Sequence, residues 1–166
     1  MADIKANYPA ASDATITLAS LASDTSLLAG RESSEVANTS NLYLDYLISG
    51  KITTGTTPTV SRVIEVWAIG SWDGTNWPDV FDGTDSAETI TSADIKNSVC
   101  RLVASMVVSA TSNVTYPFGP VSLASLFGGV VPPKFAFFVT HSTAVALNAT
   151  AANHQIRIQP YYETVT

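Results

Sequence analysis

Acidic side chains gather in one stretch of the sequence, which is the first place to look for chemistry. Six of the fourteen acidic residues lie there: Asp73, Asp79, Asp82, Asp85, Glu88 and Asp94. The spacing of Asp79, Asp82 and Asp85 around Gly83 would let a Ca²⁺ ion gather their oxygen atoms, although the twelve-residue EF-hand pattern with its closing glutamate is missing. Because aspartate beside glycine also starts turns, we expect solvated turns and no bound metal, with calcium binding by these three aspartates as the alternative.

Nucleophiles and other metal ligands are sparse. The histidines His141 and His154 lie in or beside expected strands, and no Gly-x-Ser-x-Gly motif supplies a serine nucleophile for them. Cys100 is the only cysteine, so no internal disulfide forms, and it falls in an apolar strand where a thiol is usually packed rather than reactive. Neither Cys-x-x-Cys nor His-Glu-x-x-His occurs. We therefore expect no enzymatic activity and no cofactor.

Three tryptophans within eleven residues indicate an aromatic contact surface. Trp67 falls in the middle of an expected strand, whereas Trp72 and Trp77 flank the turn at Asp73–Gly74. Large amphipathic rings are common in protein interfaces, and exposed rings also stack on sugars. We expect packing in the core or against another subunit, with Trp67, Trp72, Trp77 and Tyr43 as the interface residues. Sugar binding by Trp72 and Trp77 is the alternative.

The composition describes a protein held together by an apolar core or by its neighbours. Of 166 residues, 46% are hydrophobic and only 13% are charged, an apolar content that excludes intrinsic disorder. The net charge is −6 and no basic run occurs, so we expect no nucleic-acid partner. The uncharged stretch 102–133 is interrupted by Ser109, Pro117 and Pro120, and the N-terminus lacks the order of a signal peptide. We therefore expect no membrane partner.

Short β-strands are the elements that would position these residues. Residues 41–53 alternate with period two, with polar residues on one face and, on the other, Leu42, Leu44, Tyr46, Ile48 and Ile52. Residues 62–69 are apolar on both faces, so we expect one face to pack on the opposite sheet. We expect a loop or a neighbouring subunit to cover the other face, and we favour the neighbouring subunit. Further strands are predicted at 15–18, 99–109, 134–141 and 154–162.

Turn-forming residues separate these strands. Residues 30–35 are predicted to form an exposed loop, residues 71–94 a long connection, and residues 116–120 a break. Residues 122–129 could form a short glycine-capped helix or a strand, of which we favour the strand.

The strand pattern predicts an all-β fold. Seven or eight short strands without a long helical period favour an antiparallel β-sandwich or jelly roll over residues 14–166. A β-barrel and a two-sheet fold with one small helix are the alternatives. Residues 1–13 carry few large apolar side chains, so we expect them to form an extended N-terminal arm.

Three segments resemble structural proteins of tailed bacteriophages: Leu42–Tyr46, Gly50–Gly55 and Trp77–Ser86. Over residues 40–166 the chain is similar in texture to small head-associated proteins of the capsid decoration, or cement, class. The resemblance implies a non-enzymatic β-sandwich subunit that binds the lattice of the major capsid protein and clusters as a dimer or trimer. It also implies a location on the capsid exterior of the virion, after synthesis in the bacterial host cytoplasm, and it supplies no catalytic residues.

Other functional classes fit parts of the same sequence. A tail, neck or fibre component is an alternative, because no position distinguishes a head protein from a tail protein. A carbohydrate-binding β-sandwich module would use the exposed tryptophans, and a small hydrolase is the least favoured class. Between Arg101 and Arg157 the only formally charged residue is Lys134, which indicates extensive burial in a core or against partners. We therefore expect a protein lattice as the partner.

Overall fold

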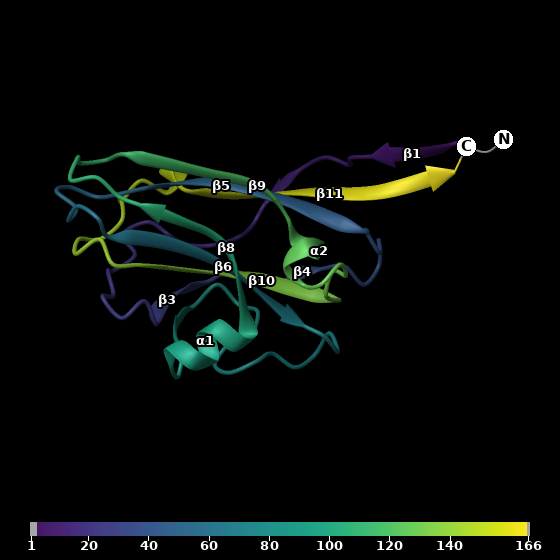
Figure 1. Cartoon of the computed structure of the whole chain (residues 1–166), viewed down its shortest axis with the longest axis horizontal. Helices are drawn as coiled ribbons and strands as arrows, with labels where there is room; N and C mark the ends of the chain where they lie inside the picture. Colours follow the sequence, from purple (N-terminus) through teal and green to yellow (C-terminus); the bar gives the residue numbers. More distant parts are fainter. Residues whose placement is uncertain (1–2, 166) are drawn as a thin grey trace.

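The computed structural model describes residues 3–165 and contains two antiparallel sheets packed face to face (Figure 1). One sheet has the order β1-β11-β5-β9, formed by Ile4–Asn7, Gln155–Val165, Asp45–Thr53 and Thr115–Ser122, with β2 (Ser12–Asp13) beside β11. The other has the order β7-β3-β10-β6-β8, formed by Ala87–Thr89, Ala29–Glu32, Lys134–His141, Val63–Ser71 and Cys100–Val107, with β4 (Val36–Ala37) beside β10. The predicted all-β sandwich is confirmed, with eleven strands in place of seven or eight.

The main core lies between the two sheets and follows the period-two pattern. Ile48 of β5 and Ile156 of β11 meet Val66 of β6 and Phe137 of β10, and all four side chains are fully buried. Burying one aliphatic or aromatic side chain of this size contributes about 1.5–3 kcal/mol. The alternation predicted for residues 41–53 holds only from Tyr46 onward.

The start of that predicted strand is wrong. The strand begins at Asp45, and the preceding Leu42 and Leu44 are 69% and 54% exposed. The side chain of Asn38 instead holds this segment as a turn, since it hydrogen-bonds both backbone groups of Tyr43. Two large apolar side chains are therefore left at the surface.

β6 is apolar on both faces, and the same chain covers the second face. Ile64 and Val66 point into the main core. The other face packs beneath the 71–92 connection and helix α1 (Ala93–Val99), in a second cluster that comprises Trp67, Ile69, Phe81, Ile90, Cys100 and Phe138. The favoured cover of this face, a neighbouring subunit, is therefore wrong, because the connection and α1 of the same chain cover it.

A bulge in β8 lets this strand contribute to both clusters. The pairing of β6 with β8 slips by one residue at Val103. An extra residue in one strand reverses which side chains face inward beyond it. Cys100, before the bulge, consequently faces the second cluster, whereas Met106, after it, faces the main core.

Residues 122–129 contain a helix rather than the favoured strand. Helix α2 (Leu123–Leu126) begins after Ser122, whose hydroxyl oxygen accepts a hydrogen bond from the N–H of Ser125 at 3.1 Å. At its other end the N–H of Gly129 donates to the carbonyl of Ala124 at 2.7 Å. These caps satisfy backbone groups at both ends of the single helical turn. A search for alternating apolar and polar residues does not detect such caps, so it misses the helix.

Three further predictions about strands and loops are wrong. Residues 15–18 form no strand, and residues 30–35 are not an exposed loop, because they begin within β3 and include the fully buried Glu32. Residues 116–120 lie within β9, an edge strand, where the missing N–H of a proline need not interrupt a ladder. The 71–94 connection also contains β7 and the first residues of α1, and the 3-10 helix η1 (Ala151–Asn153) precedes β11.

β1 and the end of β11 leave the body as a two-stranded ribbon (Figure 1). In this ribbon, residues 4–7 pair with residues 162–165, from Ile4 opposite Val165 to Asn7 opposite Tyr162. The pairing of β11 with β5 stops at Tyr161, so within residues 3–165 the outer part of β11 has only β1 as a strand partner. Much of the predicted arm is therefore paired with β11. No helix in the described part of the chain is both long and apolar enough to span a membrane.

Candidate functional site

The three aspartates considered for calcium are each engaged in separate hydrogen bonds. The carboxylate of Asp79 accepts from the N–H and hydroxyl of Thr91 at 3.0 and 2.6 Å. That of Asp82 accepts from the N–H and hydroxyl of Thr84 at 2.9 and 2.6 Å. The bonds of Asp82 are the short-range ones by which aspartate starts a turn, whereas those of Asp79 join residues twelve positions apart in the same connection.

The carboxylate of Asp85 ties three distant segments together. The guanidinium of Arg31, on β3, donates to it at 2.6 Å, and the N–H and hydroxyl of Thr17 donate at 3.0 and 2.6 Å. Burial acts to raise the pKa of Asp85, but these bonds and the charge of Arg31 outweigh it and lower the pKa. Asp85 therefore fixes the connection to the body.

A different set of carboxylates converges beside this loop. Oxygen atoms of Glu32, Asp82 and Glu88 lie within 4.8 Å of one another. Glu32 is fully buried and accepts from the backbone N–H of Gly83 at 2.8 Å and of Asp82 at 3.2 Å. Gly83 has φ +77°, and a Cβ there would lie 2.9 Å from the ring of Trp77, so glycine suits this turn on both counts.

Glu32 has a strongly perturbed acidity. Burial raises its pKa to about 7, against the lowering effect of the two backbone N–H bonds, and the negative charges of Asp82 and Glu88 add to the rise. No local signal in the sequence marks this residue, because residues 30–35 are glycine, serine and charged residues, which are typical of an exposed loop. Only the pairing of β3 with β10, which places Glu32 opposite Phe138, buries it.

The predicted interface tryptophans occupy three different environments. Trp67 is buried, its indole N–H donates to Glu65 at 2.9 Å, and the ammonium group of Lys96 lies 5.0 Å from its ring centroid. Trp77 is half-buried against the second cluster. Trp72 is 56% exposed and meets Phe127 edge-on at 5.8 Å. A cation over an indole ring is attracted to it electrostatically, so Trp67 and Lys96 stabilise each other within the protein interior.

The histidines and the cysteine are held in the structure. His141 is fully buried, with its ring nitrogens 3.0 Å from the hydroxyl of Thr143 and 3.0 Å from the carbonyl of Leu21. Burial lowers the pKa of His141 and of His154, the latter also hydrogen-bonded to a backbone carbonyl. Burial raises the pKa of Cys100 to about 12, which disfavours the reactive thiolate.

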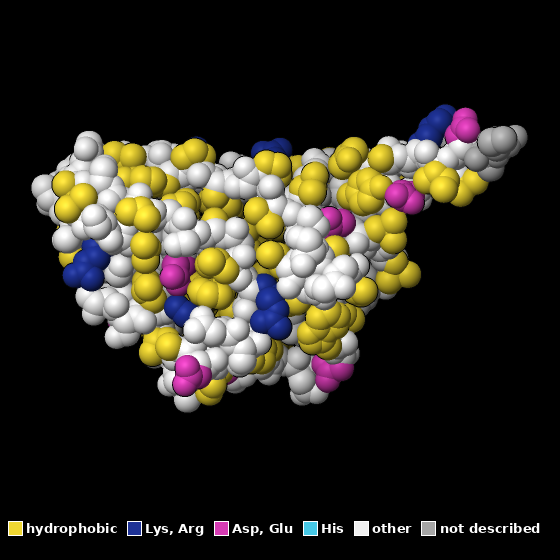
Figure 2. All heavy atoms as spheres, in the orientation of Figure 1, with side chains coloured by type: hydrophobic (Ala, Val, Ile, Leu, Met, Phe, Trp, Pro, Cys, Tyr) yellow, Lys and Arg dark blue, Asp and Glu magenta, His cyan; other side chains and the backbone are white. Residues whose placement is uncertain are grey.

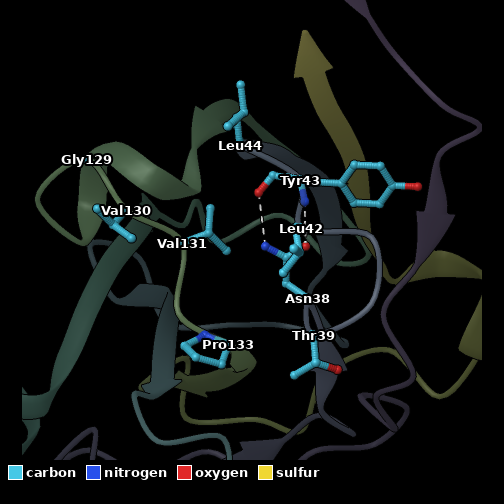
Figure 3. Close-up of a pocket in the computed structure, with 9 residues that line it drawn as sticks. All are labelled: Asn38, Thr39, Leu42, Tyr43, Leu44, Gly129, Val130, Val131 and Pro133. Atoms are coloured by element: carbon cyan, nitrogen blue, oxygen red, sulfur yellow. Dashed lines mark hydrogen bonds between the residues drawn. The ribbon is translucent and has the colours of Figure 1, made fainter. Parts of the chain in front are cut away.

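A groove of about 490 Å³ opens at the end of the sandwich from which the ribbon departs, here called the ribbon end (Figure 3). Leu42, Leu44 and Val130 line it and are 69%, 54% and 62% exposed. Val131 and the half-buried Tyr43 lie deeper in the same groove. The groove therefore presents mainly apolar side chains to solvent.

The polar side chain at the base of the groove already has its partners. The amide of Asn38 donates to the carbonyl of Tyr43 at 3.0 Å and accepts from the N–H of Tyr43 at 2.8 Å (Figure 3). The hydroxyl of Tyr46 also donates to Asn38, at 2.9 Å. Because the base of the groove is rigidly held and its hydrogen bonds are used internally, the groove suits an apolar ligand better than a polar one.

Most of the exposed large hydrophobic side chains lie at the ribbon end or on the ribbon itself. Trp72 belongs to this set, since the preceding Ser71 pairs with Lys134, next to the lining of the groove. Figure 2 shows hydrophobic side chains continuing from this end of the body on to the ribbon. Among residues 3–165, the exposed large hydrophobic side chains at the ribbon end or on the ribbon are Ile4, Tyr8, Leu42, Leu44, Trp72, Val130 and Val165.

The structure thus separates the residues predicted to form one interface. Tyr43 and Trp72 lie at the ribbon end, Trp77 lies within the 71–94 connection and packs against the second cluster, and Trp67 lies in the interior. Comparison of the sequence with known protein families finds no matching family, and no curated protein matches it. Function is therefore inferred from the residues and their geometry.

Proposed function

We propose that this protein is a non-enzymatic structural subunit of a virion, which binds and stabilises the assembled capsid surface through the ribbon end of its sandwich. The observation that carries the proposal is the concentration of exposed apolar side chains there, Leu42, Leu44, Trp72 and Val130 among them. A contiguous exposed apolar surface is typical of a protein-binding site. The resemblance to decoration proteins favours the lattice of the major capsid protein as the partner.

The chemistry of the groove favours a protein partner over a sugar. Specific sugar binding needs several free hydrogen-bonding groups beside a ring, whereas the amide of Asn38 is already engaged by Tyr43 and Tyr46. An apolar side chain from a neighbouring subunit needs no such groups. It would gain from leaving water at about 25 cal/mol per Å² of buried apolar surface.

Cosedimentation with assembled capsids tests the proposal. Wild-type protein is expected to pellet with capsids in physiological salt and still to do so at about three times that ionic strength, because apolar contact is not screened as charge attraction is. Val130→Asp is expected to abolish binding. The matched control is Val107→Asp, since Val107 is 65% exposed but lies at the far end of β8.

Two outcomes would contradict the proposal. One is a wild-type protein that fails to pellet with capsids at every salt concentration. The other is equal loss of binding in the Val130→Asp and Val107→Asp variants, which would show that the ribbon end has no special part. Cosedimentation with purified tails or necks, and not with heads, would favour a tail or neck component.

Carbohydrate binding is the second candidate, and the exposure of Trp72 favours it. The ring lies beside a small hollow of about 180 Å³ that Arg101 and Phe127 also line. An exposed indole offers an apolar face on which a sugar ring can stack, and a guanidinium can donate hydrogen bonds to the sugar hydroxyls. Glycan-array binding that disappears in Trp72→Ala, while capsid binding persists, would establish this function; a blank array would exclude it.

A further inference from the structure

The ribbon has almost no cover from the rest of the molecule. Ile4 and Val165, which pair across it, are 70% and 71% exposed, and Lys5 is exposed as well. An isolated two-stranded ribbon is at best marginally stable in water, because it buries little apolar surface against the entropy lost on ordering. A further strand beside this ribbon of four residue pairs would therefore stabilise it.

The free edge of the ribbon belongs to β1. The side of the outer β11 facing β5 is partly closed by the body, since the N–H of Leu44 donates to Tyr161 and the ring of Tyr43 lies 5.9 Å from that of Tyr162. At the opposite edge of the same sheet, β9 carries Pro117 and Pro120, and proline lacks the N–H that an added strand would need. Within residues 3–165, no strand pairs with the outer edge of β1.

The sequence at this edge is complementary to itself. Asp3, Ile4 and Lys5 are consecutive and exposed. In an antiparallel pair of two identical strands centred on Ile4, each Asp3 stands opposite Lys5 of the other strand. Directly opposite side chains of opposite charge stabilise an antiparallel pair, whereas like charges destabilise it. A lysine at a sheet edge normally repels other strands, so an aspartate two residues away makes the edge selective for its own copy.

We propose that β1 pairs with β1 of a second copy of this chain, so that two ribbons join edge to edge across a two-fold axis at Ile4. The joined sheet has the order β11-β1-β1-β11. Because Val165 stands opposite Ile4, one face acquires an unbroken row of four apolar side chains, Val165, Ile4 and their two symmetry copies. The Asp3–Lys5 pairs flank this row on the other face, as the period of two requires.

This dimer does not depend on the proposed capsid binding. It uses the edge of the ribbon and leaves the groove beside Leu44 and Val130 open. The experiment needs only the purified chain, so its failure and the failure of capsid binding are distinguishable.

Charge exchange on β1 tests the dimer by sedimentation velocity over a range of protein concentrations. The wild type is expected to show a concentration-dependent monomer–dimer equilibrium. Asp3→Lys and Lys5→Asp, each alone, place like charges opposite one another twice in the dimer. Each is expected to weaken it by at least about tenfold.

Combination of the two changes gives the decisive result. The double variant Asp3→Lys/Lys5→Asp restores opposite charges and is expected to dimerise as the wild type does. An equal mixture of the two single variants is expected to form the heterodimer, although neither dimerises well alone. Arg62→Asp is the matched control for Lys5→Asp, because it makes the same charge change at an exposed site far from the ribbon and should leave the equilibrium unchanged.

A wild type that stays monomeric at the highest concentration reached would overturn the proposal, as would a dimer that neither single variant weakens. Dimerisation of the double variant that is as weak as that of the single variants would also overturn it, because the register centred on Ile4 predicts that the double change restores the dimer. Amide hydrogen exchange gives a second readout. Outward-facing N–H groups in residues 3–7 should gain protection as the protein is concentrated, and an absence of such protection would refute pairing at this edge.

Discussion

Replacement of Glu32 by glutamine should make the protein more stable at alkaline pH. The carboxyl group of Glu32 is fully buried beside Asp82 and Glu88, and burial raises its pKa to about 7 from the ordinary 4.5. In Glu32→Gln the side-chain oxygen can still accept from the N–H of Gly83, and the new NH₂ group can donate to the neighbouring carboxylates. The variant therefore keeps the packing and removes a buried charge.

The sign and the size follow from proton linkage. Because the folded state binds the proton of Glu32 more tightly than the unfolded state does, its stabilising effect is complete below pH 4.5 and is lost as the pH rises through about 7. The shift corresponds to about 3 kcal/mol at about 1.4 kcal/mol per pKa unit. Between about pH 5 and about pH 8, the wild type should lose about 2–3 kcal/mol relative to Glu32→Gln.

The comparison of two proteins isolates this group from the histidines. Burial lowers the pKa of His141 and of His154, so their contribution to stability has the opposite sign and is lost as the pH falls below 6.5. That contribution is common to the wild type and to Glu32→Gln, and it cancels in the difference. The measured wild-type profile alone would mix the two effects.

Urea unfolding at a series of pH values, followed by tryptophan fluorescence, measures the difference directly. Asp94→Asn is the matched control, because it removes a carboxylate from the exposed first turn of α1 and should change stability by at most about 1 kcal/mol. Glu88→Gln removes one of the charges that raise the pKa of Glu32, so it should shrink the pH effect without abolishing it. Parallel pH profiles for wild type and Glu32→Gln, or lower stability of the variant at about pH 8, would refute the reasoning.

Other predictions concern the remaining site residues. Cys100, whose pKa burial raises to about 12, should not react with a thiol reagent in the native protein and should react at once in denaturant; rapid native labelling would contradict its burial. Trp67→Ala should cost about 3–5 kcal/mol of unfolding free energy, whereas Trp72→Ala should cost less than about 1 kcal/mol, as measured by urea unfolding. Calcium or a chelator should leave the melting temperature unchanged, because the carboxylates of Asp79 and Asp82 already accept hydrogen bonds within the connection; a rise of several degrees with calcium would instead indicate a site.

The sequence by itself determined the class of fold and five of the eleven strands that the structure describes, namely β5, β6, β8, β10 and β11. Alternation through Tyr46, Ile48 and Ile52 predicts a half-buried strand because side chains in a strand point to opposite faces in turn. The doubly apolar stretch 62–69 likewise predicts cover on both faces. Such inferences succeed because they depend on residues that are near one another in the chain.

Contacts between distant residues decided the rest, together with side-chain-to-backbone hydrogen bonds that the alternation of residues does not register. Nothing local distinguishes Glu32 from a loop residue, and only its pairing with β10 and the return of the 82–83 backbone bury it. The helix at α2 depends on one serine cap, which a period-two count does not register. Leu42 and Leu44 fit the strand pattern, yet the hydrogen bonds of Asn38 hold them out in solvent.

The ribbon shows the same division. The sequence indicates that residues 1–13 carry little to bury, which leaves their position open. Only the tertiary structure places residues 4–7 beside the end of β11, beyond the reach of β5, and so exposes both Ile4 and Val165. Strand pairing joins segments from opposite ends of the chain through backbone hydrogen bonds that are the same for every residue type except proline. The partner of a strand is therefore decided by the packing of the whole sandwich, while the sequence decides which faces need cover.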